Sequence, residues 1–136
     1  MVRADLVEQW DLLIEGQASR EQVHGWADPR PRAGETPDPL VMVGLQLLFG
    51  ATGAASEASP SELSRLRDAW LADCAAYDAD PAGWRRARAQ ATLRGLRRDH
   101  PDRAPEAALV FLREGILTEQ DVREAVAGDV PDAGLA

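Results

Sequence analysis

The residues of this chain that could bind a metal begin with a short run rich in carboxylates. The run 78–83, DADPAG, places carboxylates at positions 1 and 3 of a calcium-binding loop and a glycine at position 6. Calcium requires about six to eight oxygen ligands, yet loop positions 5 and 12 are Ala82 and Ala89. Because two carboxylates cannot complete that shell, we interpret Asp80 as the N-cap of a helix beginning at Pro81, and we expect no metal.

The chain holds few side chains suited to zinc binding or nucleophilic catalysis. Its only histidines are His24 and His100, and its only cysteine is Cys74. A structural zinc site needs about four such ligands, usually in closely spaced pairs, and these three are scattered. Cys74 falls on the apolar face of a predicted helix, which favours a core thiol, while His24 on a short helix is expected to be exposed. With no GxSxG, HExxH or glycine-rich phosphate motif either, we expect no catalysis and no cofactor.

Basic residues gather in one segment of an otherwise acidic chain. Residues 84–103 contain seven arginines and two acids, whereas residues 1–83 contain 14 acids and six arginines, and residues 104–136 seven acids and two arginines. All 15 basic residues are arginine, which excludes lysine chemistry. The candidates for phosphate contact are Arg85, Arg86, Arg88, Arg94, Arg97 and Arg98.

Two interpretations of these arginines remain open. They could contact phosphate, which would make the protein a nucleic-acid-associated or regulatory accessory protein. They could instead neutralise the flanking acidic helices within the fold. We prefer internal charge balance, because the arginines are spread around the predicted helix and the net charge is −8. The last helical hairpin has helix-turn-helix spacing, but Glu119, Asp121 and Glu124 on its second helix would repel DNA.

Acidic residues near the amino-terminal helices suggest a different surface. A strongly acidic chain favours a basic protein partner over nucleic acid or an anionic membrane. A tryptophan exposed beside such acids would be a suitable anchor for that partner. The candidate partner-binding residues are Asp5, Glu8, Asp11, Glu15, Glu21, Asp28, Glu35 and Trp26.

Periodic apolar residues and capping signals predict about seven helices. In the segment 81–99 the apolar residues lie on two sides, so this helix either packs between two neighbours or breaks near Gly95. Two stretches also match at a separation of 99 residues, as punctuation typical of helical hairpins. The matched pairs are Gly16 with Gly115, Ser19 with Thr118, and Val23 with Val122. The expected helices span residues 4–15, 20–27, 39–49, 60–77, 81–99, 105–114 and 119–126.

The segment 39–49 is the most apolar of these, with Gln46 as its one polar residue. Asp38 and Pro39 suit a helix start, and Gly50 suits a left-handed exit, although a buried strand is the alternative. A helix that is apolar all round must be buried all round, and this one is too short to span a bilayer. We therefore predict an all-α single compact domain over residues 1–128 around this central helix, with a flexible tail at 129–136.

Residues from about 6 to 77 resemble small acidic helical proteins of actinobacteria. The resemblance rests on the runs LLIEG at 12–16 and SREQV at 19–23, on Trp26-Ala27, and on Asp38-Pro39 with the apolar helix. Some proteins of this kind resemble immunity proteins that neutralise a cognate toxin. The resemblance implies a non-catalytic, toxin-neutralising protein and carries over no functional residue. Because the first residues are not those of a signal peptide and a single cysteine excludes an internal disulfide, we expect a cytoplasmic location.

Overall fold

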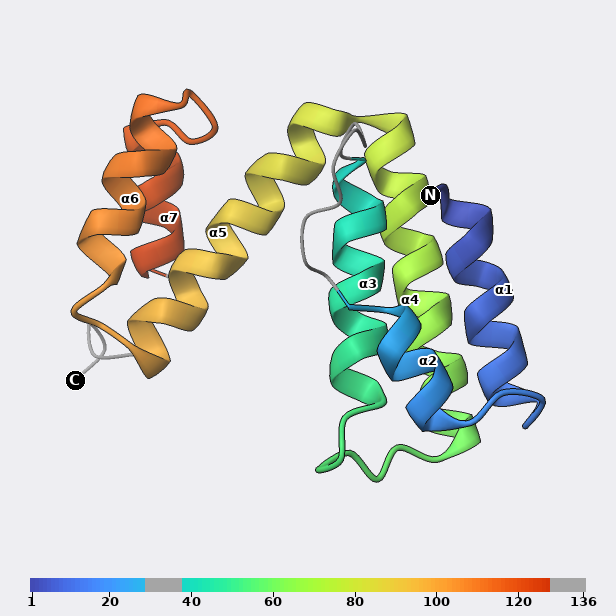
Figure 1. Ribbon diagram of the computed structural model, residues 1–136. Coiled ribbons are helices and arrows are strands. Elements are labelled where there is room, and N and C mark those ends of the chain that lie inside the picture. The colour runs from blue at the N-terminus through green and yellow to red at the C-terminus, as the bar shows by residue number, and fades with distance from the viewer. Residues whose placement is uncertain (29–37, 128–136) are drawn as a thin grey trace. The chain divides into compact units, whose positions relative to one another are not determined.

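The computed structural model describes residues 1–28 and 38–127, and over these residues the chain is all-α (Figure 1). The prediction of an all-α protein with about seven helices is confirmed. Glu35 and the predicted tail at 129–136 lie outside the described residues. The helices are α1 (Arg3–Ile14), α2 (Arg20–Trp26), α3 (Pro39–Ala51), α4 (Pro60–Ala79), α5 (Pro81–Asp99), α6 (Ala104–Arg113) and α7 (Glu119–Ala127).

The seven described helices start within one residue of the predicted positions, and capping side chains are present at several of these starts. The Asp38 carboxylate accepts a hydrogen bond from the Leu40 amide at 2.9 Å, and Asp80 accepts one from the Gly83 amide at 3.0 Å. Asp80 therefore acts as the predicted N-cap. The prediction for Gly50 is wrong, because α3 continues through Gly50 to Ala51.

The helices fall into two compact units, residues 1–75 and residues 76–136. The first unit contains α1, α2, α3 and most of α4, and the second contains α5, α6 and α7. Each unit buries apolar side chains of its own. The predicted core around the segment 39–49 therefore belongs to the first unit.

In the first unit α3 packs against both α1 and α2. Trp10 and Trp70 are completely buried there, together with Leu6. The Trp70 indole N–H donates to the Leu40 carbonyl at 2.8 Å, which satisfies the polar atom of a buried ring. A Cβ placed on Gly44 would lie 2.5 Å from the Leu6 side chain and 2.8 Å from the Trp70 ring, so a glycine here permits close packing.

The prediction that α3 is buried on every side holds only in part. Leu40, Leu45 and Leu48 are buried, but Gln46 and Gly50 are exposed. The remaining edge of the helix is half-buried. The described residues therefore leave one edge of α3 only partly covered.

His24 also departs from its predicted exposure, because it lies half-buried against the end of α3. Its ring stacks on Phe49 with the two centroids 4.0 Å apart, and its Nδ1 lies 3.0 Å from the Phe49 carbonyl oxygen. Nearby, the Arg20 guanidinium donates to the carbonyls of Ser56 and Ala58 in the connection between α3 and α4. These contacts attach α2 to both ends of that connection.

In the second unit α5 packs against α6 and α7. The helix continues unbroken through Gly95, so the predicted alternative of a break there is wrong. Its buried residues are Ala89 and Leu93, which meet Leu117 and Ala125 in a small core. This core is built from smaller side chains than the tryptophan-centred core of the first unit.

The two matched stretches adopt the same turn, once in each unit. Gly16 ends α1 with φ 73°, and Gly115 ends α6 with φ 71°, in the left-handed region that favours glycine. The Gly16 amide donates to the Leu13 carbonyl at 3.2 Å, and the Gly115 amide donates to Leu112 at the same distance. The predicted correspondence of the hairpins α1–α2 and α6–α7 is thus confirmed.

Candidate binding surfaces

The clearest charged surface of the first unit lies along α1. Glu8 and Asp11 lie in α1 and Glu15 is its C-cap, and their spacing of three and four residues puts them on one face. We call these three residues the acidic stripe. Glu8 and Glu15 are exposed, and Asp11 is half-buried. Glu21, in the first turn of α2, is exposed as well.

The other predicted partner-binding residues do not extend this stripe into one surface. The Asp5 carboxylate accepts a hydrogen bond from the Val2 amide at 2.8 Å and so serves the start of α1. Trp26 and Asp28 are half-buried. Of the predicted residues that the structure describes, Glu8, Glu15 and Glu21 therefore present charge most openly.

Most of the arginines described in the first unit are already engaged. Arg3 pairs with Asp38 at 2.9 Å. Arg67 donates to Asp11 at 2.8 Å and to Asp68 at 3.2 Å, and these hydrogen bonds raise the pKa of the Arg67 guanidinium. Only Asp11 of the acidic stripe is compensated in this way, so Glu8 and Glu15 keep their negative charge facing solvent.

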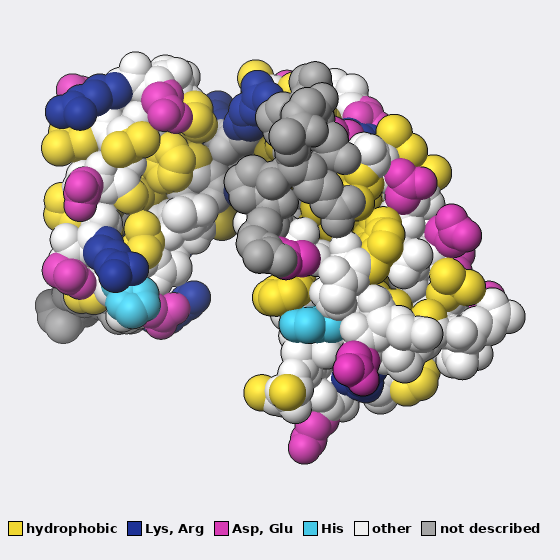
Figure 2. Space-filling model, viewed as in Figure 1, with side chains coloured by type: hydrophobic (Ala, Val, Ile, Leu, Met, Phe, Trp, Pro, Cys, Tyr) yellow, Lys and Arg dark blue, Asp and Glu magenta, His cyan; other side chains and the backbone are white. Residues whose placement is uncertain are grey.

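Figure 2 agrees with this imbalance. On the face in view, acidic side chains are scattered over the part formed by α1 to α4, with few basic side chains among them. Such a surface produces a negative potential that attracts cationic groups and is weakened by salt.

Arg86 shows what one of the candidate phosphate-binding arginines does. Its Nε donates to the Asp121 carboxylate at 2.8 Å, which joins α5 to α7. Asp121 is only 2% exposed, although the sequence suggested an acidic residue on the surface of α7. That interpretation was wrong, because the carboxylate points into the fold and meets a cation there. This contact is of the kind that the interpretation of internal charge balance predicts for Arg86.

Asp121 is also the capping residue of the second hairpin. Its carboxylate accepts a hydrogen bond from the Thr118 amide at 2.9 Å, while its own amide donates to the Thr118 hydroxyl at 3.1 Å. The bond from the Thr118 amide, and then Arg86, hold the pKa of Asp121 below its ordinary value although burial acts in the opposite direction. Gln90 adds a bond to the Asp121 carbonyl at 3.2 Å. Among the described residues, Asp121 is therefore the main polar connection between α5 and α7.

The remaining candidate arginines have separate surroundings. Arg85 lies 5.7 Å from the centre of the Tyr77 ring and Arg88 lies 5.4 Å from that of the Trp84 ring, as in cation–π contacts. Arg98 pairs with its neighbour Asp99 at 3.5 Å. Because they serve different contacts, these arginines do not form a single phosphate-binding face.

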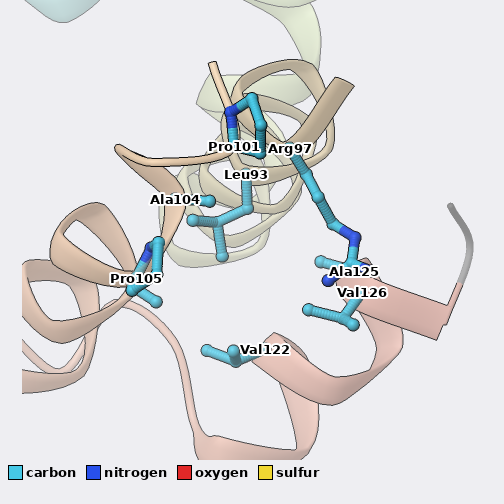
Figure 3. Close-up of a pocket in the computed structure, with 9 residues that line it drawn as sticks. Leu93, Arg97, Pro101, Ala104, Pro105, Val122, Ala125 and Val126 are labelled. Carbon is cyan, nitrogen blue, oxygen red and sulfur yellow. The ribbon is translucent and has the colours of Figure 1, made fainter. Parts of the chain in front are cut away.

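Arg97 lies at a groove in the second unit (Figure 3). The groove has a volume of about 370 Å³, and its walls come from α5, α6 and α7 and from the turn that joins α5 to α6. Apart from Arg97 its lining side chains are apolar: Leu93, Pro101, Ala104, Pro105, Ala108, Val122, Ala125 and Val126. Among the described residues, no second polar side chain lines it to fix the orientation of a small molecule, which ligand sites normally provide.

Within residues 1–28 and 38–127, no group of three or more His, Cys, Asp or Glu side chains is placed to hold a metal ion. Cys74 is buried, as predicted for a core thiol. No helix in the same part of the chain combines the length and the apolar character needed to cross a membrane. No protein-family model matches the chain, and no curated protein or solved structure is significantly similar to it.

Proposed function

We propose that this chain is a non-catalytic protein-binding protein that uses the acidic stripe of α1 to recognise a partner with a basic surface. The observation that carries the proposal is the exposure of Glu8 and Glu15 on one helix face, with no arginine paired to either among the described residues. Uncompensated charge on a regular element is suited to a partner of opposite sign, because it steers the encounter and selects among partners.

The geometry of the stripe limits what the partner must present. Glu8 and Glu15 are two helical turns apart, or about 10 Å at about 1.5 Å per residue. Arginine or lysine side chains with similar spacing on a rigid surface would meet both carboxylates at once. Glu21 on α2 offers a further contact beyond the hairpin turn.

The class of partner that we propose is a toxin that this protein neutralises. The stripe ends at Glu15, within the run LLIEG whose resemblance to actinobacterial immunity-type proteins suggests this role. Neutralisation needs only a tight and selective complex and requires no catalytic site. Rapid association, which acidic surfaces promote against basic partners, suits a protein that must capture its target quickly.

The direct test is to co-express the chain with the product of the neighbouring gene and to measure both rescue of growth and complex formation. The variant E8R/E15R should slow association about tenfold at low salt and change dissociation much less, because exposed charges act mainly on the encounter. The control E57R/E124R changes the net charge equally at exposed acids elsewhere. A lack of rescue and of complex formation would contradict the proposal, as would equal effects of the two variants.

A further inference from the structure

The outer face of α6 carries a short stripe that has no partner within the described structure. Leu109 and Val110 are neighbours, and each lies three or four residues from both Glu106 and Arg113, which places the four residues together on one side of the helix. All four are exposed: Leu109 by 53% and Val110 by 42% of their surface. We call these four residues the α6 stripe.

The residue types of the α6 stripe differ from those usual on an exposed helix face. An acid in the first turn and a base in the last turn are expected from the helix dipole, and this accounts for Glu106 and Arg113. It does not account for the two adjacent branched apolar residues between them. Leu109 and Val110 are two of only four large apolar side chains that are exposed among the described residues, and they are neighbours.

We propose that the α6 stripe binds the same stripe of a second copy of this chain, with the two helices antiparallel. The stripe is complementary to itself in that arrangement. Its midpoint falls between Leu109 and Val110, so a two-fold axis there brings Leu109 of one copy against Val110 of the other. The same axis pairs Glu106 of each copy with Arg113 of the other, which is the reciprocal contact that a two-fold interface requires.

The size of the stripe sets the strength of the dimer. Ten residues of helix span about 15 Å, and one face of that length is small beside a standard interface of about 1,600 Å² in total. The apolar centre supplies affinity, and the two flanking ion pairs fix the antiparallel orientation and exclude the parallel one, which would put like charges together. The dimer should therefore be weak, forming between micromolar and millimolar protein concentration.

Because the α6 stripe lies in the second unit and the acidic stripe in the first, this inference is independent of the proposed function. The dimer would present two copies of the acidic stripe, yet either could exist without the other. Sedimentation equilibrium of the purified protein alone tests the inference with no toxin present.

The decisive experiment exchanges the two charges. Each single variant, E106R or R113E, places like charges opposite each other at both ends of the interface and should weaken dimerisation about tenfold or more. The double variant E106R/R113E restores both pairs with reversed sign and should return the dissociation constant to within a few-fold of the original. L109D should abolish dimerisation, since it places a charge in the apolar centre.

The charge exchange also separates dimerisation from folding. The double variant opposes the helix dipole at both ends of α6, so it should be the least helical of the charge variants by circular dichroism, yet it should dimerise. The variant E124R, which reverses an exposed acid on α7, should leave the dissociation constant unchanged. A protein that stays monomeric to millimolar concentration, or a double variant no better than the single ones, would overturn the proposal and leave the face to another occupant.

Discussion

The hairpins α1–α2 and α6–α7 share one backbone design and differ in almost everything that surrounds it. Each has a glycine with positive φ at the same place, followed by a capped second helix. In the first, the residue that completes the capping box is Gln22, which is neutral and exposed. In the second it is Asp121, which is charged, buried and bound by Arg86.

The helix against which each hairpin packs explains this difference. The first packs against α3, an almost wholly apolar helix, and their contact is completed by buried tryptophans. The second packs against α5, which is rich in arginine and offers only Ala89 and Leu93 as buried residues. A charged supporting helix cannot supply the same apolar area. The ion pair between the exposed Arg86 side chain and the buried Asp121 carboxylate, together with the capping bonds, replaces part of it.

The local turn motif therefore does not determine which contacts hold the hairpin in place. The same glycine and capping positions occur beside the tryptophan-centred core of the first unit and beside the contact between Arg86 and Asp121 in the second. The first arrangement depends on shape and should be insensitive to pH, whereas the second depends on charge and should respond to acid. Substitutions or pH changes that affect one hairpin alone can therefore test whether the two hairpins are stabilised differently.

The largest difference in stability between the two hairpins should appear when Asp121 loses its charge. Because the pKa of Asp121 is lower in the folded protein than its ordinary value, its stabilisation is complete above that ordinary value, near 4. This stabilisation is lost as the pH falls further, through the lowered pKa that Asp121 has in the folded protein. D121N should remove this acid-dependent loss and lower stability at neutral pH, because Arg86 then faces a neutral partner.

Urea titrations followed by NMR at neutral and acid pH would measure this effect. The amides of Ser19 and Thr118 are equivalent probes, since each donates to the side chain that closes its capping box. The Thr118 amide should lose protection in the acid titration and in D121N, while that of Ser19 stays nearly constant. Equal pH dependence of the two probes would contradict a special role for Asp121.

A second and smaller difference concerns how closely the supporting helices approach their neighbours. In α3, G44A would press against a Trp70 ring that is fully buried and held by its bond to Leu40, so overpacking should cost about 1–3 kcal/mol. The same change at Gly50, which has open space around it, should stabilise by about 0.5–1 kcal/mol through helix propensity.

Gly95 extends that test to α5. A Cβ there would have only the Arg98 side chain within reach, at 4.0 Å, so G95A should behave like G50A rather than G44A. Thermal unfolding of the three variants gives the comparison directly. Stabilisation by G44A would mean that the core of the first unit is packed less tightly around Trp70 than these distances indicate.

Local signals made much of the fold predictable from the sequence. Asp38 with Pro39, Asp80 with Pro81, and Ser19 with Gln22 each define a helix start through atoms a few residues apart. The 99-residue match likewise predicted the shared turn, because the conformation of that turn depends on its glycine. The division into two units was not predicted, since it follows from which helices share a core.

The binding surfaces were less predictable, because they depend on contacts between residues that are far apart in the sequence. The sequence named Glu8, Asp11 and Glu15 as candidates without grouping them, and only the fold shows that Asp11 meets Arg67. Asp121 has the sequence signature of any acid in a first helical turn, and its burial depends on Arg86, 35 residues away. The half-buried position of His24 similarly depends on Phe49, 25 residues away.

The smallest expected effect is one in which the two hairpins should agree. Gly16 and Gly115 have φ near +70°, and a Cβ added to either would have no atom within 4 Å, so only backbone conformation opposes a replacement. G16A and G115A should each cost about 1 kcal/mol, and asparagine at either position should cost less because it tolerates this conformation. Urea unfolding of the single variants and of the double variant would test both equality and additivity. A clearly larger cost at Gly115 would show that the charged surroundings of the second hairpin constrain the turn itself, and the shared backbone design would then be only a resemblance in form.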